Sequence, residues 1–271
     1  MTSDTTGPRP GQQIMIATVP NLRDLGGWPT LDGRVRYGVL FRSAEFSGLQ
    51  GEDAAAFARL GIRSVFDLRT EAERVQQPNQ LPAGIEYVVL DILKDSSQAG
   101  AAQLLTVLGD PKAAEAMLGG GKSLGLFKES YREVVALPSA RAGYRQFFSA
   151  IAGDEHTPAV FHCTTGKDRT GWAAAASLLL LGVSHDDVFA DYLLTNDQLL
   201  PALQPVLDQF RSIGGDPELL MPVVGVQKEY LETAISEMHK RYQTIDGYFS
   251  QGLGLDAATI GRLRDRLTDR G

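Results

Sequence analysis

The residues best suited to chemistry lie together in one short segment, HCTTGKDRTG at positions 162–171. It holds the chain's single cysteine, Cys163, and six positions later Arg169. Residues 159–162 predict a short buried strand before the loop, and the Ala- and Leu-rich residues 171–181 predict a buried helix after it. A strand, a loop of small residues and a helix start together favour an anion site, because backbone N–H groups converge there and the helix dipole adds positive charge.

Such a site also favours the thiolate form of cysteine, which is the nucleophile. We therefore expect Cys163 to attack a phosphate monoester and to form a phosphocysteine. The planar guanidinium of Arg169 matches two phosphate oxygens, which a lysine would not imitate. Thr170 is expected to donate a hydrogen bond to the sulfur, and His162 either orders the loop or fills the space beneath it. The other residues expected to surround the phosphate are Thr164, Thr165 and Gly166.

The composition limits the other possible functions. At 271 residues, of which 43% are hydrophobic, the chain can bury one substantial core. Its 26 basic and 33 acidic residues give a net charge of -7, which opposes general binding to nucleic acids or anionic membranes. A single cysteine excludes an internal disulfide framework and a cysteine-rich zinc site. The four histidines lack the spacing of a metal site, so no metal and no cofactor are expected.

Residues 1–15 are polar and rich in Gly and Pro, and we interpret them as a flexible tail. They lack the basic and apolar parts of a signal peptide, and no stretch of about 18 apolar residues occurs in the chain. No integral membrane segment is therefore expected. We expect the protein in the cytoplasm, or exported without a cleavable signal peptide.

Strand and helix patterns alternate along the chain, which predicts an α/β fold with a central, mostly parallel sheet flanked by helices. We expect one domain over 16–271, with residues 94–125 as a helical lid insertion because they are too long for an ordinary connection. The C-terminal third is predicted to be helical. The expected strands are 35–41 after a turn at Asp32–Gly33, 62–68 and 85–90; the expected helices are 52–60, one capped by Thr70 and Glu73, 126–137 and 138–152.

The loop resembles the Cys-x5-Arg-Ser/Thr signature of the protein tyrosine phosphatase superfamily, and in particular a bacterial tyrosine/serine phosphatase branch. The resemblance covers nearly the whole chain. It implies a cysteine-dependent phosphatase in which Lys167 and Asp168 are functional, and the same pair is similar to loop charges of phosphoinositide phosphatases. The further segments that carry the resemblance are NLRDLGG at 21–27, LFRSAE at 40–45, DLRTEAE at 67–73, ADYLLTND at 190–197 and GVQKEYL at 225–231.

Hydrolysis needs a general acid, and the chain offers several carboxylates. Asp168 is preferred, because the resemblance points to it and it lies in the loop; alternatively it only fixes Arg169 or backbone N–H groups. Asp91 and Asp95 follow a strand where related enzymes carry a mobile-loop acid, although the surrounding sequence departs from that pattern. Asp67 is more simply explained as the partner of Arg69 in an ion pair that shapes the pocket wall.

The segment NLRD at 21–24 has two interpretations. Asn21, Arg23 and Asp24 brace the phosphate loop from outside, or Arg23 and Asp24 form an ion pair within a turn, and we favour the second interpretation.

Three functions remain open. The first is a protein tyrosine phosphatase, of tyrosine or dual specificity, and the second is a phosphoinositide phosphatase with the same loop chemistry. The third is a module that binds phosphorylated partners without turnover.

The segment GGGKS at 119–123 is similar to the end of the nucleotide-binding motif GxxxxGK(S/T). That motif would need glycine at position 116, where this chain has Ala116, so we interpret the segment as a turn.

Overall fold

The structure is a computed structural model, and it describes residues 8–96 and 109–270. Its centre is a five-stranded sheet in the order β1 (Arg23–Asp24), β4 (Leu40–Ser43), β7 (Ala159–His162), β5 (Ser64–Asp67) and β6 (Glu86–Val89). The pairs β4–β7, β7–β5 and β5–β6 are parallel, and only β1 runs antiparallel to its neighbour. The mostly parallel sheet predicted from the alternating pattern is therefore confirmed.

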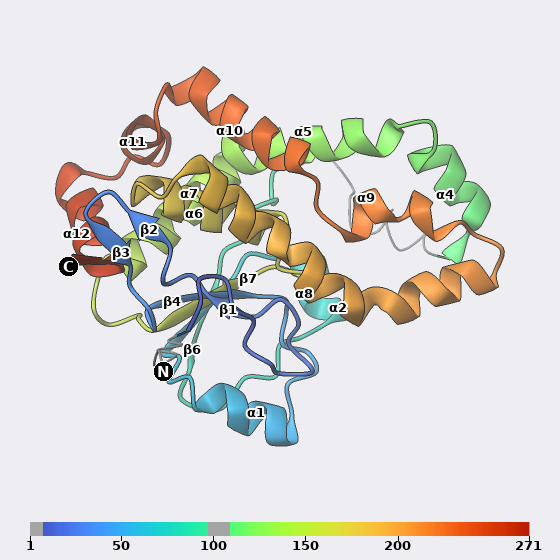
Figure 1. The fold of residues 1–271 in the computed structure, drawn as a ribbon, viewed down its shortest axis with the longest axis horizontal. Helices are drawn as coiled ribbons and strands as arrows, with labels where there is room; N and C mark the ends of the chain where they lie inside the picture. Colours follow the sequence, from blue (N-terminus) through green and yellow to red (C-terminus); the bar gives the residue numbers. More distant parts are fainter. Residues whose placement is uncertain (1–7, 97–108, 271) are drawn as a thin grey trace, which may run out of the picture.

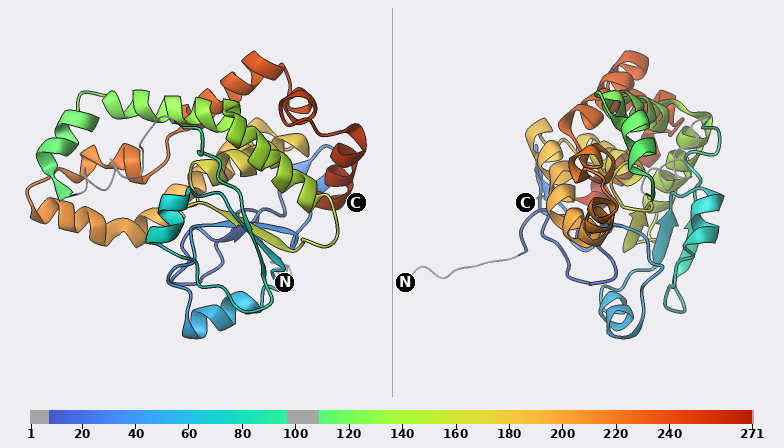
Figure 2. Two further views of the ribbon diagram at one scale, coloured as in Figure 1. Left: turned by 180° about the vertical axis from the view of Figure 1, so that it is seen from behind. Right: turned by 90° about the vertical axis from the view of Figure 1, so that its right-hand side faces the viewer.

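Helices cover both faces of this sheet (Figures 1 and 2). Alternate residues of the central strands point to opposite faces, as the two-residue period of a strand requires. Phe161 of β7 packs into the large core with α6 and α7, whereas Val160 packs into a smaller core with Phe57 of α1. Because both faces are buried, β4, β5 and β7 consist entirely of buried residues.

The helices of the structure include all those predicted with bounds, to within two residues except at 126–137, where the helix begins four residues earlier at Lys122. In chain order they are α1 (Gly51–Ala58), α2 (Glu71–Gln76), α4 (Pro111–Leu118), α5 (Lys122–Ala136), α6 (Pro138–Ile151), α7 (Arg169–Leu180), α8 (His185–Ser212), α9 (Met221–Val224), α10 (Lys228–Tyr242), α11 (Ile245–Gly247) and α12 (Ala257–Leu267), with a 3-10 turn at Pro217–Leu219 and a π-helical turn at Tyr248–Gly252.

The prediction of one strand over 35–41 is wrong. The turn at Asp32–Gly33 does join two strands, β2 (Pro29–Thr30) and β3 (Gly33–Val35). However, β3 ends at Val35, and it pairs with β8 (Thr268–Arg270) in a separate small sheet. The chain then turns at Gly38, whose φ of 73° is left-handed, before β4 begins. The C-terminal third accordingly ends in a strand and is not helical throughout.

Only parts of two predicted segments lie in the described residues. Within the predicted tail, residues 1–7 lie outside them, whereas the Ile14 N–H donates to the Leu22 carbonyl at 2.8 Å. Within the predicted lid at 94–125, residues 97–108 lie outside them. Only the first part of the GGGKS segment is the predicted turn: residues 119–121 join α4 to α5, with left-handed Gly120 and Gly121, whereas Lys122 and Ser123 begin α5. A lid function for this region stays a prediction.

Helices α4 and α9 and the C-terminal half of α8 extend beyond the sheet, and we call them the arm (Figure 1). The arm has its own small hydrophobic core, which includes Leu118 of α4, Phe210 of α8 and Val224 of α9. Within the described residues, no helix is long and apolar enough to cross a membrane.

Candidate active site

The loop that carries Cys163 lies at the carboxyl end of the central strand β7. The last residues of β4, β7 and β5 are paired there, with Ser43 on one side of His162 and Asp67 on the other. Cys163 is buried, and α7 begins at Arg169. Gly166 has a left-handed φ of 69°, and a Cβ at this position would lie 2.2 Å from the Ser43 carbonyl oxygen. Only glycine lets the loop approach β4 this closely.

The guanidinium of Arg169 is held by Glu73, the third residue of α2. Its Nη1 and Nη2 donate to the two carboxylate oxygens at 2.7 and 2.6 Å, and Nη1 also donates to the Leu68 carbonyl at 3.4 Å. Among the described residues nothing accepts from Nε or from the second hydrogen of Nη2. A guanidinium carries five N–H donors, so these two remain and form one edge that fits two phosphate oxygens.

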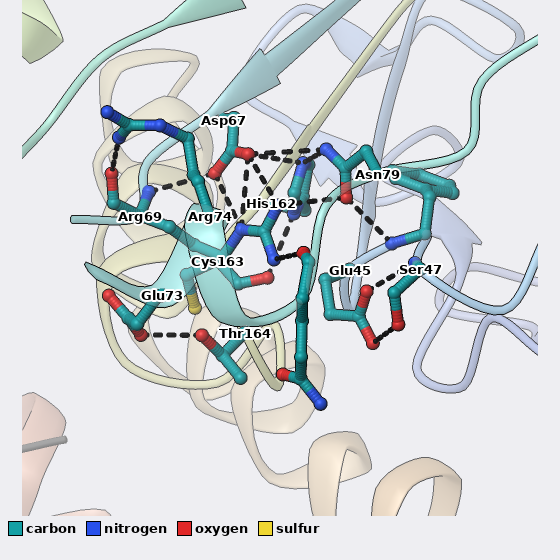
Figure 3. Close-up of polar contacts among 12 residues, drawn as sticks. Glu45, Ser47, Asp67, Arg69, Glu73, Arg74, Asn79, His162, Cys163 and Thr164 are labelled. Atoms are coloured by element: carbon teal, nitrogen blue, oxygen red, sulfur yellow. Dashed lines mark hydrogen bonds and ion pairs between the residues drawn. The ribbon is translucent and has the colours of Figure 1, made fainter. Parts of the chain in front are cut away.

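Glu73 also fixes the start of the loop and the start of its own helix. Its carboxylate accepts a hydrogen bond from the Thr164 hydroxyl at 2.5 Å (Figure 3), and from the Thr70 N–H and hydroxyl in the predicted capping box. Burial would raise the pKa of Glu73, but Arg169 and Thr164 hold it far below its ordinary value. The pKa of Arg169 is raised, because the charge and hydrogen bonds of Glu73 outweigh its burial. This ion pair therefore persists across the physiological pH range.

His162 lies beneath the loop in a closed hydrogen-bond network (Figure 3). Its Nδ1 lies 2.9 Å from the Cys163 carbonyl and its Nε2 lies 3.0 Å from Asn79 Nδ2. The Asn79 Oδ1 accepts from Arg69 and from the Phe46 N–H, so its NH2 group faces the ring. These contacts assign the proton to Nδ1. Burial lowers the pKa of His162 to about 4, so the ring is neutral at pH 7.

Asp67 forms the predicted ion pair with Arg69, at 2.8 Å and with both side chains fully buried. It also accepts a hydrogen bond from the Tyr87 hydroxyl at 2.6 Å. Burial raises the pKa of Asp67, but His162 and the Arg69 guanidinium outweigh burial and lower it overall. Asp67 also accepts a hydrogen bond from Asn79 Nδ2 at 3.2 Å, which joins it to the network around His162. A role in shaping the pocket wall stays a prediction.

Lys167 and Asp168 pair with each other at 2.8 Å, beneath α5. The Lys167 ammonium lies 4.5 Å from the centre of the Phe127 ring, and the Tyr131 hydroxyl donates to Asp168 Oδ1 at 2.8 Å. Lys167 is almost fully buried, whereas 26% of the Asp168 side chain is exposed. Both donors meet Asp168 at Oδ1, and within the described residues Oδ2 accepts no hydrogen bond.

The two other candidate acids are engaged elsewhere. Asp95 accepts a hydrogen bond from the Ser139 N–H at 2.8 Å, at the start of α6. Asp91 accepts one from the Leu93 N–H at 3.2 Å, within its own turn. Among the described residues, neither has a hydrogen bond or ion pair with a residue of the loop.

Two local predictions are wrong. Arg23 pairs with Asp191 of α8 at 2.9 Å and not with Asp24, which accepts from the N–H groups of the turn residues Gly26 and Gly38. The hydrogen bond expected from Thr170 to the Cys163 sulfur is also not formed, since the buried Thr170 hydroxyl has no partner in the part of the chain described.

Sequence reasoning missed several residues of the site. Glu73 was recognised only as part of a capping box, and its second role depends on how α2 meets α7. Asn79 and Tyr131 give no local signal, because they come from distant elements, and Asp191 was noted only within the segment ADYLLTND that carries the resemblance. Among the described residues, no group of three or more His, Cys, Asp or Glu side chains is placed to hold a metal ion.

Comparison with known proteins agrees with this arrangement. Residues 14–269 match the model of the tyrosine phosphatase family. The chain is 30% identical to a Cupriavidus necator protein assigned to the tyrosine-protein phosphatases, over 91% of this chain and 86% of that protein. It is also 30% identical to the triple specificity protein phosphatase PtpB of Mycobacterium tuberculosis, over 90% and 95%, and 27% identical to a tyrosine-protein phosphatase of Nostoc commune, over 85% and 74%. The loop, the buried cysteine and these relatives agree, and the chain belongs to the tyrosine phosphatase family.

Proposed function

We propose that this enzyme hydrolyses phosphate monoesters through a covalent phosphocysteine at Cys163. The observation that carries the proposal is the state of the loop backbone. Within residues 8–96 and 109–270, none of the backbone N–H groups of residues 164–168 donates a hydrogen bond. Together with the free edge of Arg169 and the N-terminus of α7, they offer a set of donors for a dianion beside the cysteine.

The reaction proceeds in two steps. The Cys163 thiolate attacks phosphorus, so the S–P bond forms while the bond from phosphorus to the leaving oxygen breaks and that oxygen takes a proton. Water then attacks phosphorus, the S–P bond breaks, and the proton of the water passes to the base. Inorganic phosphate leaves and the thiolate is restored. The free edge of Arg169 binds two equatorial oxygens throughout and stabilises the charge that develops on them.

Asp168 supplies the proton in the first step and accepts it in the second. It is the candidate carboxylate that is both part of the loop and exposed to a substrate, whereas Asp67 is fixed by Arg69 and Asp91 and Asp95 bind backbone elsewhere. Lys167 and Tyr131 both donate to Asp168 Oδ1. This leaves Oδ2 to hold the proton that is transferred.

The substrate is a phosphotyrosine protein, with phosphoserine or phosphothreonine as a second class. The phosphoinositide alternative needs Lys167 to contact a further phosphate, and this side chain is buried between Asp168 and Phe127. A phosphate on the substrate's ring would have to displace one of these contacts. The arrangement therefore favours a single phosphate in the site.

The test is hydrolysis of p-nitrophenyl phosphate, a phosphotyrosine peptide and a panel of phosphoinositides, with EDTA and without added metal. Wild type and Cys163→Ser are compared, and we expect turnover of the first two substrates only by wild type. Turnover that survives in Cys163→Ser would overturn the phosphocysteine. Phosphate binding by wild type without turnover of any substrate would instead support a binding module, and the strongest rate on a phosphoinositide would support that alternative.

The role of Asp168 is tested separately with Asp168→Asn. Alkyl phosphates have a poor leaving group that needs a proton, whereas p-nitrophenolate leaves readily without one. We expect the variant to lose more turnover on an alkyl phosphate than on p-nitrophenyl phosphate. An equal loss on both would show that Asp168 acts in another way.

A further inference from the structure

The outer side of the phosphate loop is bound by neighbouring elements at four successive carbonyl groups. The Cys163 carbonyl lies 2.9 Å from His162 Nδ1, and the Thr164 carbonyl accepts from the Glu45 N–H at 3.1 Å. The carbonyls of the next two residues are bound by side chains. Thr165 accepts from Asn21 Nδ2 at 3.2 Å, and Gly166 accepts from Asn21 Nδ2 at 3.1 Å and from Arg42 Nη2 at 2.8 Å.

Each of these bonds fixes the orientation of one peptide group. In a planar trans peptide the C=O of one residue and the N–H of the next point in opposite directions. Carbonyls that are directed outward at Thr164, Thr165 and Gly166 therefore direct the N–H groups of residues 165, 166 and 167 the other way. These are three of the loop N–H groups that donate no hydrogen bond within the described part of the chain.

The two side chains that bind the loop carbonyls are themselves held rigidly. Arg23 donates to Asn21 Oδ1 at 2.5 Å, so the Asn21 amide can present only its NH2 group to the loop. Asp191 of α8 binds Arg23 at 2.9 Å and Arg42 at 2.7 Å. Both guanidiniums are fully buried, and the Asp191 side chain is 2% exposed.

Burying these three charged side chains removes them from water, which costs free energy of folding. Two cations share one anion, and burial together with Arg23 lowers the pKa of Arg42 to about 10, which still leaves it charged at pH 7. Apolar side chains of the same volume would often serve stability as well or better. They would, however, leave the carbonyls of Thr165 and Gly166 unbound and their peptide groups free to turn.

We propose that Asn21 and Arg42, held by Asp191, are positioning residues for phosphate binding. They do not touch the phosphate. They hold the peptide groups that join residues 165, 166 and 167, so that the N–H groups of residues 166 and 167 face the phosphate. Without these contacts, phosphate binding itself has to order the loop, and this lowers the affinity. The inference rests on the proposed function, because it takes phosphate as the ligand of the loop.

The test is Asn21→Asp, which keeps the size of the side chain and the acceptor for Arg23. It replaces the NH2 group by an oxygen that repels both loop carbonyls, and aspartate tolerates the left-handed φ of 60° at this position. The matched control is Asn196→Asp on α8, whose amide donates to the Val226 carbonyl, away from the loop. Both variants lose an amide NH2 group that binds backbone carbonyls, two at Asn21 and one at Asn196, and both keep one acceptor.

The measurements are the affinity for inorganic phosphate by calorimetry, KM and kcat for p-nitrophenyl phosphate, and the free energy of unfolding in urea. Losing about 1.4 kcal/mol of binding corresponds to about tenfold in affinity, so we expect Asn21→Asp to weaken phosphate binding and raise KM at least about tenfold. We expect Asn196→Asp to keep its phosphate affinity and KM within about twofold of wild type, even where its free energy of unfolding falls as much as that of Asn21→Asp.

Phosphate affinity and KM in Asn21→Asp that match those of Asn196→Asp would overturn the proposal and leave a purely structural network. If Asn21→Asp does not fold, Asn21→Gly takes its place, since glycine accepts the same φ and removes the amide. The affinity measurement does not depend on turnover. A wild type that binds phosphate but hydrolyses nothing would refute the proposed function and still allow this test.

Discussion

The bond between Glu73 and Arg169 leads to the sharpest prediction, for the variant Glu73→Gln. Glutamine keeps the length of the side chain and can still accept from Thr70, so the cap of α2 is retained. It offers only one oxygen to the guanidinium and turns an NH2 group toward the other Nη. Arg169 then loses the fixed orientation that leaves its Nε edge free for phosphate.

The size of the effect follows from the two short bonds that Glu73 makes to Arg169, at 2.7 and 2.6 Å. A hydrogen bond to a charged group contributes about 1.5–3 kcal/mol, and one of the two is lost. A loss of this size in the transition state lowers kcat/KM roughly 10- to 150-fold. The affinity for inorganic phosphate should fall in the same direction.

The assay is steady-state hydrolysis of p-nitrophenyl phosphate together with phosphate binding by calorimetry. Glu71→Gln is the matched control, because Glu71 is exposed in the first turn of the same helix and its loss removes the same charge near the helix dipole. We expect Glu71→Gln to retain wild-type kinetics. A rise in phosphate affinity in Glu73→Gln would refute the reasoning, since Glu73 would then compete with phosphate for Arg169 and not orient it.

Three further outcomes are expected. Arg169→Lys should lower kcat about 100- to 1000-fold on p-nitrophenyl phosphate, because an ammonium lacks the planar guanidinium that binds Glu73 at one edge and two phosphate oxygens at the other; a loss below about tenfold would contradict this. Gly166→Ala should lower kcat/KM at least about tenfold, because its Cβ meets the Ser43 carbonyl, whereas Gly61→Ala, at a φ of 66° in open space, should not. Since the folded pKa of His162 is about 4 against 6.5 for a free ring, its contribution to stability is complete above pH 6.5 and lost as pH falls toward 4. Urea unfolding should show that wild type loses about 3 kcal/mol more than His162→Asn over this range, and equal slopes would contradict it.

The sequence predicts those parts of the site that are contiguous in the chain. The strand, loop and helix around Cys163 follow from local periodicity and from the spacing to Arg169, and the capping box at Thr70 and Glu73 follows from a short local pattern. The strand predicted over 35–41 failed because Gly38 turns the chain, and because the partner of β3 is the distant β8. Pairing with a strand that is distant in the sequence cannot be predicted from a short stretch of residues.

Side-chain partners between distant elements were beyond the same reasoning. Arg23 and Asp24 are neighbours in sequence and suggested an ion pair, yet adjacent residues of a strand point to opposite faces. Arg23 is directed toward Asp191, which follows it by 168 positions. The same limit applies to Tyr131, whose hydroxyl meets Asp168 only because α5 packs near the start of α7.

The two halves of the long helix α8 contact different parts of the molecule, and two prolines lie between them. Asp191 in the first half holds the loop network, and Phe210 in the second half belongs to the core of the arm. Pro201 and Pro205 each lack the N–H that would bond to the preceding turn, so the helix is weakest there. The two halves are nevertheless not independent, because Phe127 of α5 packs against the core of the arm and its ring centre lies 4.5 Å from the Lys167 ammonium of the loop.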